Sequence, residues 1–228
     1  KEELPRVKKV TPLGFWFQLR ESLKPRFLKR RMERNIFQLL AMLLRLIPAI
    51  RNASVGRAPA PFRGMKRIGF FNEPAVAMGE TPSANTHSNA RSLAKIAAVM
   101  AAGGKWAGRE YLGDAAWNAM HAAPLRADMG FVTTAFTQGG VARFAAVDSH
   151  GTHSEKALNA GREGFYGWLG LGGSIFQWHP QLQIGFGYVP TSLNVLDLVN
   201  ERGKSYQAEV LRCVAKLNSV NSGSAAEP

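Results

Sequence analysis

A serine and a lysine stand three residues apart in Ser92-Leu93-Ala94-Lys95, and this spacing can support chemistry. Residues three apart on a helix share a face. The lysine amine can then take the hydroxyl proton as the serine oxygen attacks an acyl carbon. The pattern has only two defining residues and arises often by chance. In addition, Leu93 and Ile96 indicate that the same helix packs against a core. The alternative is that Ser92 and Lys95 face outward as ordinary surface residues.

The stretch "DSHGTHSEK" offers a second kind of chemistry, because Asp148, His150 and His153 combine a carboxylate with two imidazoles. Such groups bind metal ions when they converge. The surrounding Gly, Ser and Thr residues favour a surface loop instead, and the sequence predicts no metal site. It also predicts no cofactor, because "GLGG" at 170–173 lacks the Lys-Ser/Thr ending of a phosphate loop and does not precede a helix.

The stretch "EGFYGWLGLGGS" at 163–174 places glycines inside an apolar strand. Glycine weakens a strand and often marks close approach of a ligand or of another backbone. One hypothesis is that a substrate lies along this strand and that one of its N–H groups stabilises a developing oxyanion. The other is a glycine-rich packing strand. The residues alone leave the two open.

The elements that would position these residues follow from periodicity and turn signals. A helix begins at Ser88 as N-cap and ends at Gly103-Gly104. The other predicted elements are a helix over 109–121, two strands across a Gly-Gly turn within 130–147, adjacent antiparallel strands at 164–177 and 181–189, and a C-terminal helix with Tyr206, Val210, Val214 and Leu217 on one stripe. This order predicts an α+β fold, an antiparallel sheet flanked by helices.

Charge divides the 228-residue chain, whose net charge is +13. Residues 1–67 hold 17 Lys and Arg against 4 Asp and Glu, whereas the remainder holds 12 of each. We therefore expect a basic segment with a helix and loops at 1–67, a neutral domain at 68–217 and a disordered tail at 218–228. The chain begins at Lys1, and we expect it to be an incomplete translation product.

The basic segment has two further interpretations. A helix from Ile36 to Ile47, closed by Pro48, is too short and too interrupted to span a bilayer. Residues 24–50 could instead lie on an anionic membrane surface, or form a core or lid helix with a solvated basic flank. Nucleic acid is disfavoured as a partner, because no stacking aromatic cluster or zinc spacing accompanies the basic run. The single cysteine, Cys213, has no partner for a disulfide, which favours an intracellular compartment.

Three stretches together carry a resemblance to a known family: "RVKKVTP" (6–12), "ETPSANTHSNARSLAKIAAVMAAGG" (80–104) and "GLGGSIFQWHPQLQIGFGYVP" (170–190). In this order they resemble the C-terminal half of the serine β-lactamase-related family, on its class C-like and carboxylesterase branch. The resemblance implies an antiparallel sheet flanked by helices beside an all-helical region, incomplete in this chain. It also implies a catalytic set of Ser and Lys in S-x-x-K, Tyr in Y-x-N, and a third motif on a strand of the active site.

Trp168-Leu169-Gly170 falls where that third motif belongs, as a W-x-G variant of K-T-G. The resemblance implies that the Leu171 N–H is the oxyanion donor and that Trp168 lines the pocket. Trp168 replaces a cation that would hold a substrate carboxylate, so small-molecule esters or amides without that group are the expected substrates.

The chain departs from the family pattern at the other motifs. No Y-x-N surrounds any of its four tyrosines, and Ser92 and Lys95 lie in a later helix than the family's nucleophile. The first hypothesis is therefore the C-terminal part of a serine acyl hydrolase whose nucleophile lies upstream of Lys1. The alternative is a catalytically inactive binding or assembly module, associated with a membrane surface through residues 24–50.

Overall fold

The structure is a computed structural model that describes residues 9, 11, 14–28, 35–38, 40, 41, 44, 71–79, 86–128, 132–170, 172–194, 197 and 199–224. Its elements are α1 (Phe15–Leu23), η2 (Arg26–Leu28), α3 (Pro74–Ala77), α4 (Ala90–Ala101), β1 (Lys105–Trp106), β2 (Arg109–Glu110), α5 (Asp114–His121), β3 (Leu125–Asp128), β4 (Thr133–Phe136), β5 (Ala142–Arg143), α6 (His153–Asn159), β6 (Tyr166–Leu169), β7 (Ile175–His179), β8 (Ile184–Tyr188) and α7 (Glu201–Ser224).

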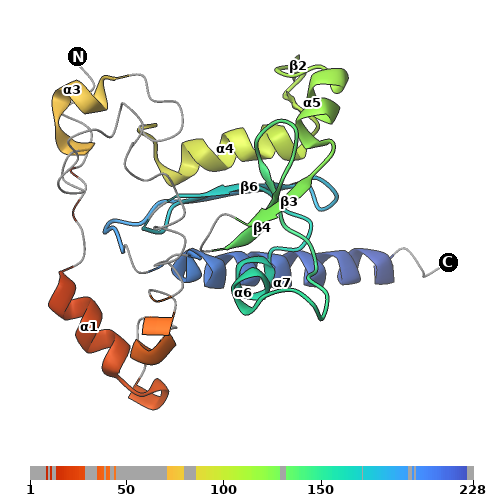
Figure 1. Cartoon of the computed structure of the whole chain (residues 1–228). Helices are drawn as coiled ribbons and strands as arrows, with labels where there is room; N and C mark the ends of the chain where they lie inside the picture. The colour runs from red at the N-terminus through yellow and green to blue at the C-terminus, as the bar shows by residue number, and fades with distance from the viewer. Residues whose placement is uncertain are drawn as a thin grey trace.

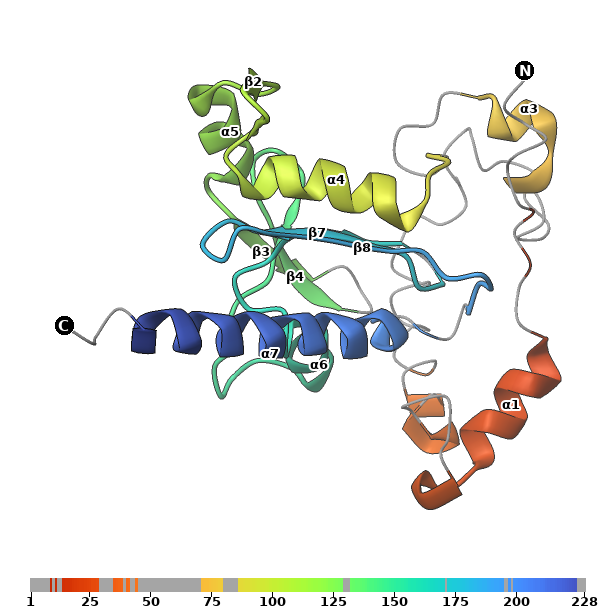
Figure 2. The ribbon, with the colours of Figure 1, turned by 180° about the vertical axis from the view of Figure 1, so that it is seen from behind.

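The core of the molecule is a six-stranded sheet whose strands follow the chain order, β3-β4-β5-β6-β7-β8. Every neighbouring pair is antiparallel. Helix α4 covers one face and α7 covers the other, so the sheet lies between two helical layers (Figure 1, Figure 2). The predicted combination of antiparallel strands and flanking helices is therefore confirmed.

The first helical layer depends on two glycines of β8. A Cβ atom on Gly185 would lie 2.2 Å from the Ala98 nitrogen, and one on Gly187 would lie 2.7 Å from the Ala90 oxygen. The helix contributes small side chains to the same contact, among them the fully buried Ala97. Backbone therefore packs directly against backbone, which is one reason for glycine inside a strand.

The second helical layer is held by a buried polar chain of contacts. The Arg162 guanidinium, wholly buried, donates from Nε to Gln207 Oε1 at 3.2 Å on α7. Gln207 Nε2 in turn donates to Gln177 Oε1 on β7 at 2.7 Å. Around this chain, Val210 and Val214 of α7 pack on the main apolar core, which includes Phe144, Leu158, Phe165 and Ile175.

The stretch 164–177, predicted as one strand, is two strands with a turn between them. β6 ends at Leu169 and β7 begins at Ile175. Gly172 and Gly173 in the turn have φ of +85° and +127°. These are conformations that glycine adopts without steric cost. They reverse the direction of the chain at a point where the apolar composition predicted that the strand continues.

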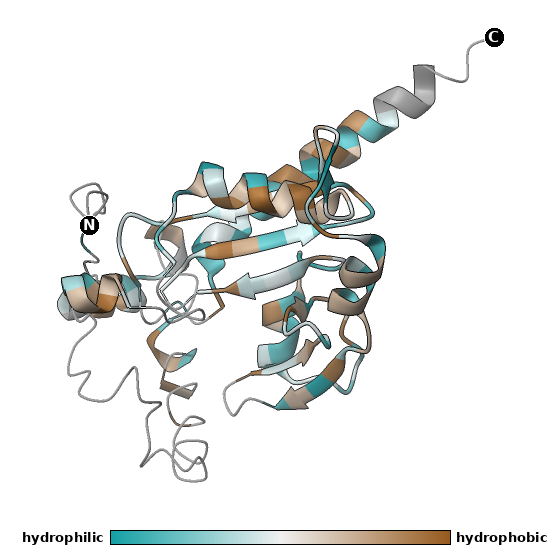
Figure 3. Ribbon diagram, turned by 90° about the horizontal axis from the view of Figure 1, so that it is seen from above, coloured by the Kyte–Doolittle hydropathy of each residue, from teal (hydrophilic) through white to brown (hydrophobic). Residues whose placement is uncertain are grey.

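Five other elements differ from the sequence prediction. The N-cap of α4 is Asn89, whose side chain accepts a hydrogen bond from Ser92 N, and not Ser88. The helix predicted over 109–121 begins only at Asp114, because 109–110 form the β1–β2 hairpin. Strand β3 and helix α6 were not predicted. Helix α7 continues to Ser224, through the start of the tail predicted at 218 (Figure 3).

The inward stripe of α7 was predicted correctly only in part, since Val210 and Val214 pack on the main apolar core. Tyr206 and Leu217 are largely exposed, whereas Gly203 and Gln207 are buried. A Cβ on Gly203 would lie 2.4 Å from Ile175 Cδ1, so the helix sits close to the sheet at this point. A polar residue and a glycine replace the apolar residues that a helix normally turns inward.

We predict that Gly185→Ala lowers the free energy of unfolding by about 2 kcal/mol, because the added methyl group meets helix backbone that cannot move aside. Urea unfolding of the full chain measures this change. Gly14→Ala is the matched control, since a Cβ there meets nothing within 4 Å. We expect it to cost less than about 1 kcal/mol, from a weaker N-cap alone. Equal losses in the two variants would contradict the packing argument.

Candidate functional site

The end of strand β6 has an open side. β7 pairs with β6 from Tyr166 to Leu169, but β5 pairs with it only at Tyr166 and Gly167. The Gly170 N–H donates to Ser174 O at 2.8 Å, across the β6–β7 turn. Because successive residues of an extended strand alternate the direction of their main-chain groups, the N–H and C=O of Leu169 point away from β7, to the side where β5 has ended.

Trp168 stands beside this open side and is half-buried. Its ring centroid lies 4.9 Å from that of Phe136 on β4. The residue before it, Gly167, has φ of +120°, and a Cβ there would lie 2.2 Å from Phe176 O. Only glycine fits this close contact, so Gly167 sets the path of the strand that presents Trp168 and Leu169.

The turn after β6 is held by the first turn of α7. Asn200 Nδ2 donates to Gly170 O at 3.0 Å and to Ser174 O at 2.7 Å. Arg202 Nη2 donates to Gly172 O at 2.7 Å, next to the place that a Cβ on Gly173 would occupy. The turn glycines are therefore bare because the protein's own residues approach them. Sequence reasoning missed Asn200 and Arg202, since no local signal connects them to this turn.

Three of the four residues predicted to bind substrate lie together here. Trp168, Leu169 and Gly170 follow one another along the open end of β6, whereas Leu171 lies outside the described residues. The Gly170 N–H is engaged by Ser174 O, so it is not free to stabilise an oxyanion. The Leu169 main chain is directed to the side that β5 leaves unpaired, but Leu169 itself is buried at 7% exposure and packs in the main apolar core.

Ser92 and Lys95 are not brought to this end of β6. Both are exposed on α4, on the side opposite the alanines that pack against β8. Within the described part of the chain, no hydrogen bond joins Ser92 Oγ to Lys95 Nζ, and the Ser92 backbone N–H serves the Asn89 cap. The surface alternative describes this pair better than a nucleophile and its base.

Asp148, His150 and His153 do not converge either. Asp148 Oδ1 accepts the backbone N–H groups of His150 and Gly151, both at 3.0 Å, and so closes a turn. His153 is exposed at the first position of α6. Across the residues that can be described, no group of three or more His, Cys, Asp or Glu side chains could hold a metal ion.

A histidine that sequence reasoning overlooked is held between two tryptophans. His121 Nδ1 lies 2.6 Å from Trp117 O, and Trp178 Nε1–H donates to His121 Nε2 at 2.8 Å. Only the neutral ring with its proton on Nδ1 satisfies both contacts. Burial lowers the pKa of His121 and outweighs the hydrogen bond to Trp117 O, which acts in the opposite direction. With both nitrogens engaged, His121 holds α5 to β7 and is not placed to act as a base.

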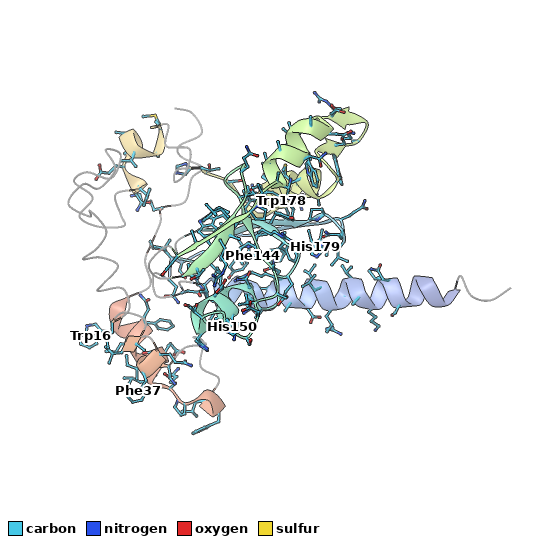
Figure 4. All side chains as sticks on the ribbon, turned by 45° about the vertical axis from the view of Figure 1, so that its right-hand side comes forward. Trp16, Phe37, Phe144, His150, Trp178 and His179 are labelled. Atoms are coloured by element: carbon cyan, nitrogen blue, oxygen red, sulfur yellow. The ribbon has the colours of Figure 1, made fainter. Side chains whose placement is uncertain are left out.

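His179 is a second histidine kept neutral by its surroundings. Its Nδ1 accepts the Leu182 N–H at 3.2 Å, and its ring meets Phe165 edge-on at 5.0 Å. Burial lowers the pKa of His179 as well. Figure 4 shows His179 with Trp178 in the sheet region, away from the labelled His150.

With this geometry described, comparison with known proteins adds no relative: no family profile, no curated protein and no solved structure matches the chain.

We predict that the free energy of unfolding falls as the pH drops below about 6.5. The unfolded chain protonates His121 and His179 at their ordinary pKa of 6.5. The folded chain takes up these protons only at lower pH, so the unfolded state binds more protons in between. The stabilisation is complete above the pKa of these groups in the unfolded chain. It is lost progressively as the pH falls, until the pH lies below their pKa values in the folded chain. Urea unfolding at a series of pH values between 7.5 and 5 measures the slope.

His121→Phe keeps a ring in the same place and removes the titration. We expect a lower free energy of unfolding at pH 7.5, because Trp178 Nε1 loses its acceptor, and a shallower slope with pH. A slope equal to that of the wild type would show that His121 does not contribute. The lowered pKa of Glu155, caused first by its hydrogen bond from Arg126, acts separately, below its ordinary value of 4.5.

Proposed function

We propose that this chain forms one wall of the acyl-binding site of a serine hydrolase of the β-lactamase-related kind, with β6 as the strand of the third motif. The observation that carries the proposal is the end of β6 that β5 leaves unpaired, where the main chain of the buried Leu169 is directed away from β7 beside the half-buried Trp168. The sequence resemblance supports it, because Trp168-Leu169-Gly170 stands at the motif position.

The chemistry of this edge favours a neutral acyl group. An ester or amide lying along β6 would meet main-chain groups on one side and the rings of Trp168 and Phe136 on the other. A strand edge of this kind supplies hydrogen bonds to a carbonyl oxygen as it gains charge. Trp168 stands at the motif position at which the resembled family carries a cation, so the proposed substrates lack a carboxylate.

The reaction also needs a serine, and Ser92 is not placed to supply it. In the first step of the proposed reaction, a serine oxygen bonds to the acyl carbon while the alcohol or amine leaves with a proton. Water then cleaves the acyl-enzyme into the carboxylic acid and the free serine. The nucleophile and its base are assigned to protein outside the described residues, and this chain contributes the wall that positions the carbonyl.

A second function is favoured by the exposure of Ser92 and Lys95. A module that presents the same edge without a nucleophile would bind acyl compounds and release them unchanged. The two functions share the binding edge and differ only in turnover, which requires a serine and a base in contact.

We predict that the amide signals of Trp168, Leu169 and Gly170 shift when the nitrogen-15-labelled chain is titrated with N-(4-nitrophenyl)butyramide, a neutral analogue that resists hydrolysis. Trp168→Lys should strengthen binding of benzylpenicillin, which carries a carboxylate, about tenfold relative to the neutral amide. Trp106→Lys is the matched control, because it adds the same charge at an exposed tryptophan on β1. No shift at β6, or equal effects of the two lysine variants, would overturn the proposal.

Turnover tests whether Ser92 acts as the nucleophile, a role that both proposed functions deny it. We expect the wild-type chain and Ser92→Ala to hydrolyse p-nitrophenyl acetate and nitrocefin equally slowly, at the rate of the buffer. A wild-type rate that Ser92→Ala abolishes would identify Ser92 as a nucleophile and overturn the assignment of the serine to another part of the protein.

A further inference from the structure

The N-terminal part of the chain exposes an unusual set of large apolar side chains. We call them the N-terminal apolar patch: Trp16, Leu23, Phe27, Leu28, Phe37, Leu40 and Leu44. Phe27 is 82% exposed and Phe37 is 78% exposed, more than any residue of the sheet core. Single exposed apolar residues are ordinary on protein surfaces, but a concentration of them in one short region marks an interaction site.

Helix α1 is inverted in polarity. Gln18, Glu21 and Ser22 are buried, with at most 3% exposure. Trp16, Arg20 and Leu23 follow the spacing i, i+4, i+7, share the opposite stripe and are all exposed. A helix that folds onto its own core normally turns the apolar stripe inward. The exposed stripe of α1 therefore carries an aromatic ring, a cation and an aliphatic chain into the solvent.

A second helical stretch repeats the arrangement. Residues 36–38, 40, 41 and 44 are helical, and Phe37, Leu40 and Leu44 have the spacing i, i+3, i+7 of one stripe. All three are more than half exposed. Figures 1 and 2 show α1 apart from the sheet and its covering helices, and Figure 4 places Trp16 and Phe37 in this outlying part.

Charge complementarity selects the surface that this patch fits. The 17 Lys and Arg against 4 Asp and Glu in residues 1–67 account for the whole net charge of the chain. An apolar stripe among basic residues is the composition of helices that lie in the interface of an anionic bilayer. We propose that the N-terminal apolar patch binds the surface of an anionic lipid bilayer, with its rings at the level of the headgroups and its basic residues on the phosphates.

The geometry fits binding in the plane of the bilayer. In the ranges that the structure covers, no helix is long and apolar enough to cross a membrane. The patch begins at Trp16, ahead of the residues 24–50 that the sequence indicated, and combines α1, η2 and the helical residues near 40. Nucleic acid would use the same charge but not the leucines, because phosphate contacts and base stacking need cations and rings.

The test is co-sedimentation of the full chain with vesicles of phosphatidylcholine and with vesicles containing 30% phosphatidylserine, a mole fraction of about one third that makes the surface clearly anionic. We expect binding to the phosphatidylserine vesicles that weakens as salt is raised, and little binding to phosphatidylcholine alone. Phe27→Ala combined with Phe37→Ala should weaken partitioning at least about tenfold, because two exposed rings lose their contact with the interface.

Trp106→Ala combined with Leu125→Ala is the matched control, since it removes two exposed apolar side chains on β1 and β3, outside the patch. We expect this variant to bind like the wild type, and circular dichroism melting curves identical to that of the wild type to show that both variants fold. Equal binding by the two double variants would overturn the proposal. So would binding to a single-stranded oligonucleotide without binding to vesicles, which would assign the basic segment to nucleic acid. Neither result depends on acyl binding at β6.

Discussion

The fold depends on one buried cation, the guanidinium of Arg162. Its Nη1 donates to Leu158 O on α6 at 2.9 Å, and its Nη2 donates to Val199 O and Asn200 O before α7 at 2.9 and 3.1 Å. Burial lowers the pKa of Arg162 to about 10, so the group stays charged at neutral pH. A buried charge needs such complete hydrogen bonding, because an unmet one costs several kcal/mol. Removing it would leave carbonyl groups of two elements without donors.

Arg162 also helps to position the candidate site, through Asn200. Arg162 binds the carbonyl of Asn200, and the side chain of the same Asn200 binds Gly170 O and Ser174 O at the end of β6. Asp197 adds a second restraint, since its Oδ1 accepts Glu201 N at 2.7 Å and starts α7. The end of β6 is therefore held by the two hydrogen bonds of the Asn200 side chain, although it lies beside a glycine-rich turn. The proposed binding role gains from these restraints, because little ordering is left to do when a ligand arrives.

The glycines, which first drew attention to this region, turn out to serve the protein's own packing. Gly185 and Gly187 admit α4, and a Cβ on Gly172 would lie 2.2 Å from Leu193 Cγ. Strand pairing, and not glycine content, supports the proposed binding edge, because β5 pairs with β6 only as far as Gly167 and leaves Trp168 and Leu169 without a strand partner on that side. Pairing is a long-range property, so composition alone could not have revealed it.

Sequence periodicity was sufficient where apolar side chains decide the fold. It predicted the alternation of β8, the extent of α4 and the strands on either side of Gly139-Gly140, because each of these patterns depends on residues only a few positions apart. It failed where polar or glycine residues decide. α7 turns Gln207 inward to reach Arg162 and Gln177, and His121 needs Trp178 from 57 positions further along the chain. The binding role that the motif resemblance implies for Trp168 stays a prediction, and the bonds from Asn200 and Arg202 to the turn after β6 were not predicted.

Two parts of the molecule bury polar side chains where apolar ones are usual. Beneath α7 the chain buries Arg162, Gln177 and Gln207, and each obtains a defined partner within the fold. In the N-terminal part it buries Gln18 and Glu21 while Phe27 and Phe37 stay in water. Arg162, Gln207 and the Oε1 atom of Gln177 are compensated by hydrogen bonds inside the protein, whereas Gln177 Nε2 is buried without a hydrogen-bond partner. Exposed rings receive no such compensation from water, so the hydrophobic effect favours any surface that removes them from it. The first arrangement specifies how the sheet and α7 pack, and the second is the basis of the proposed contact with a lipid surface.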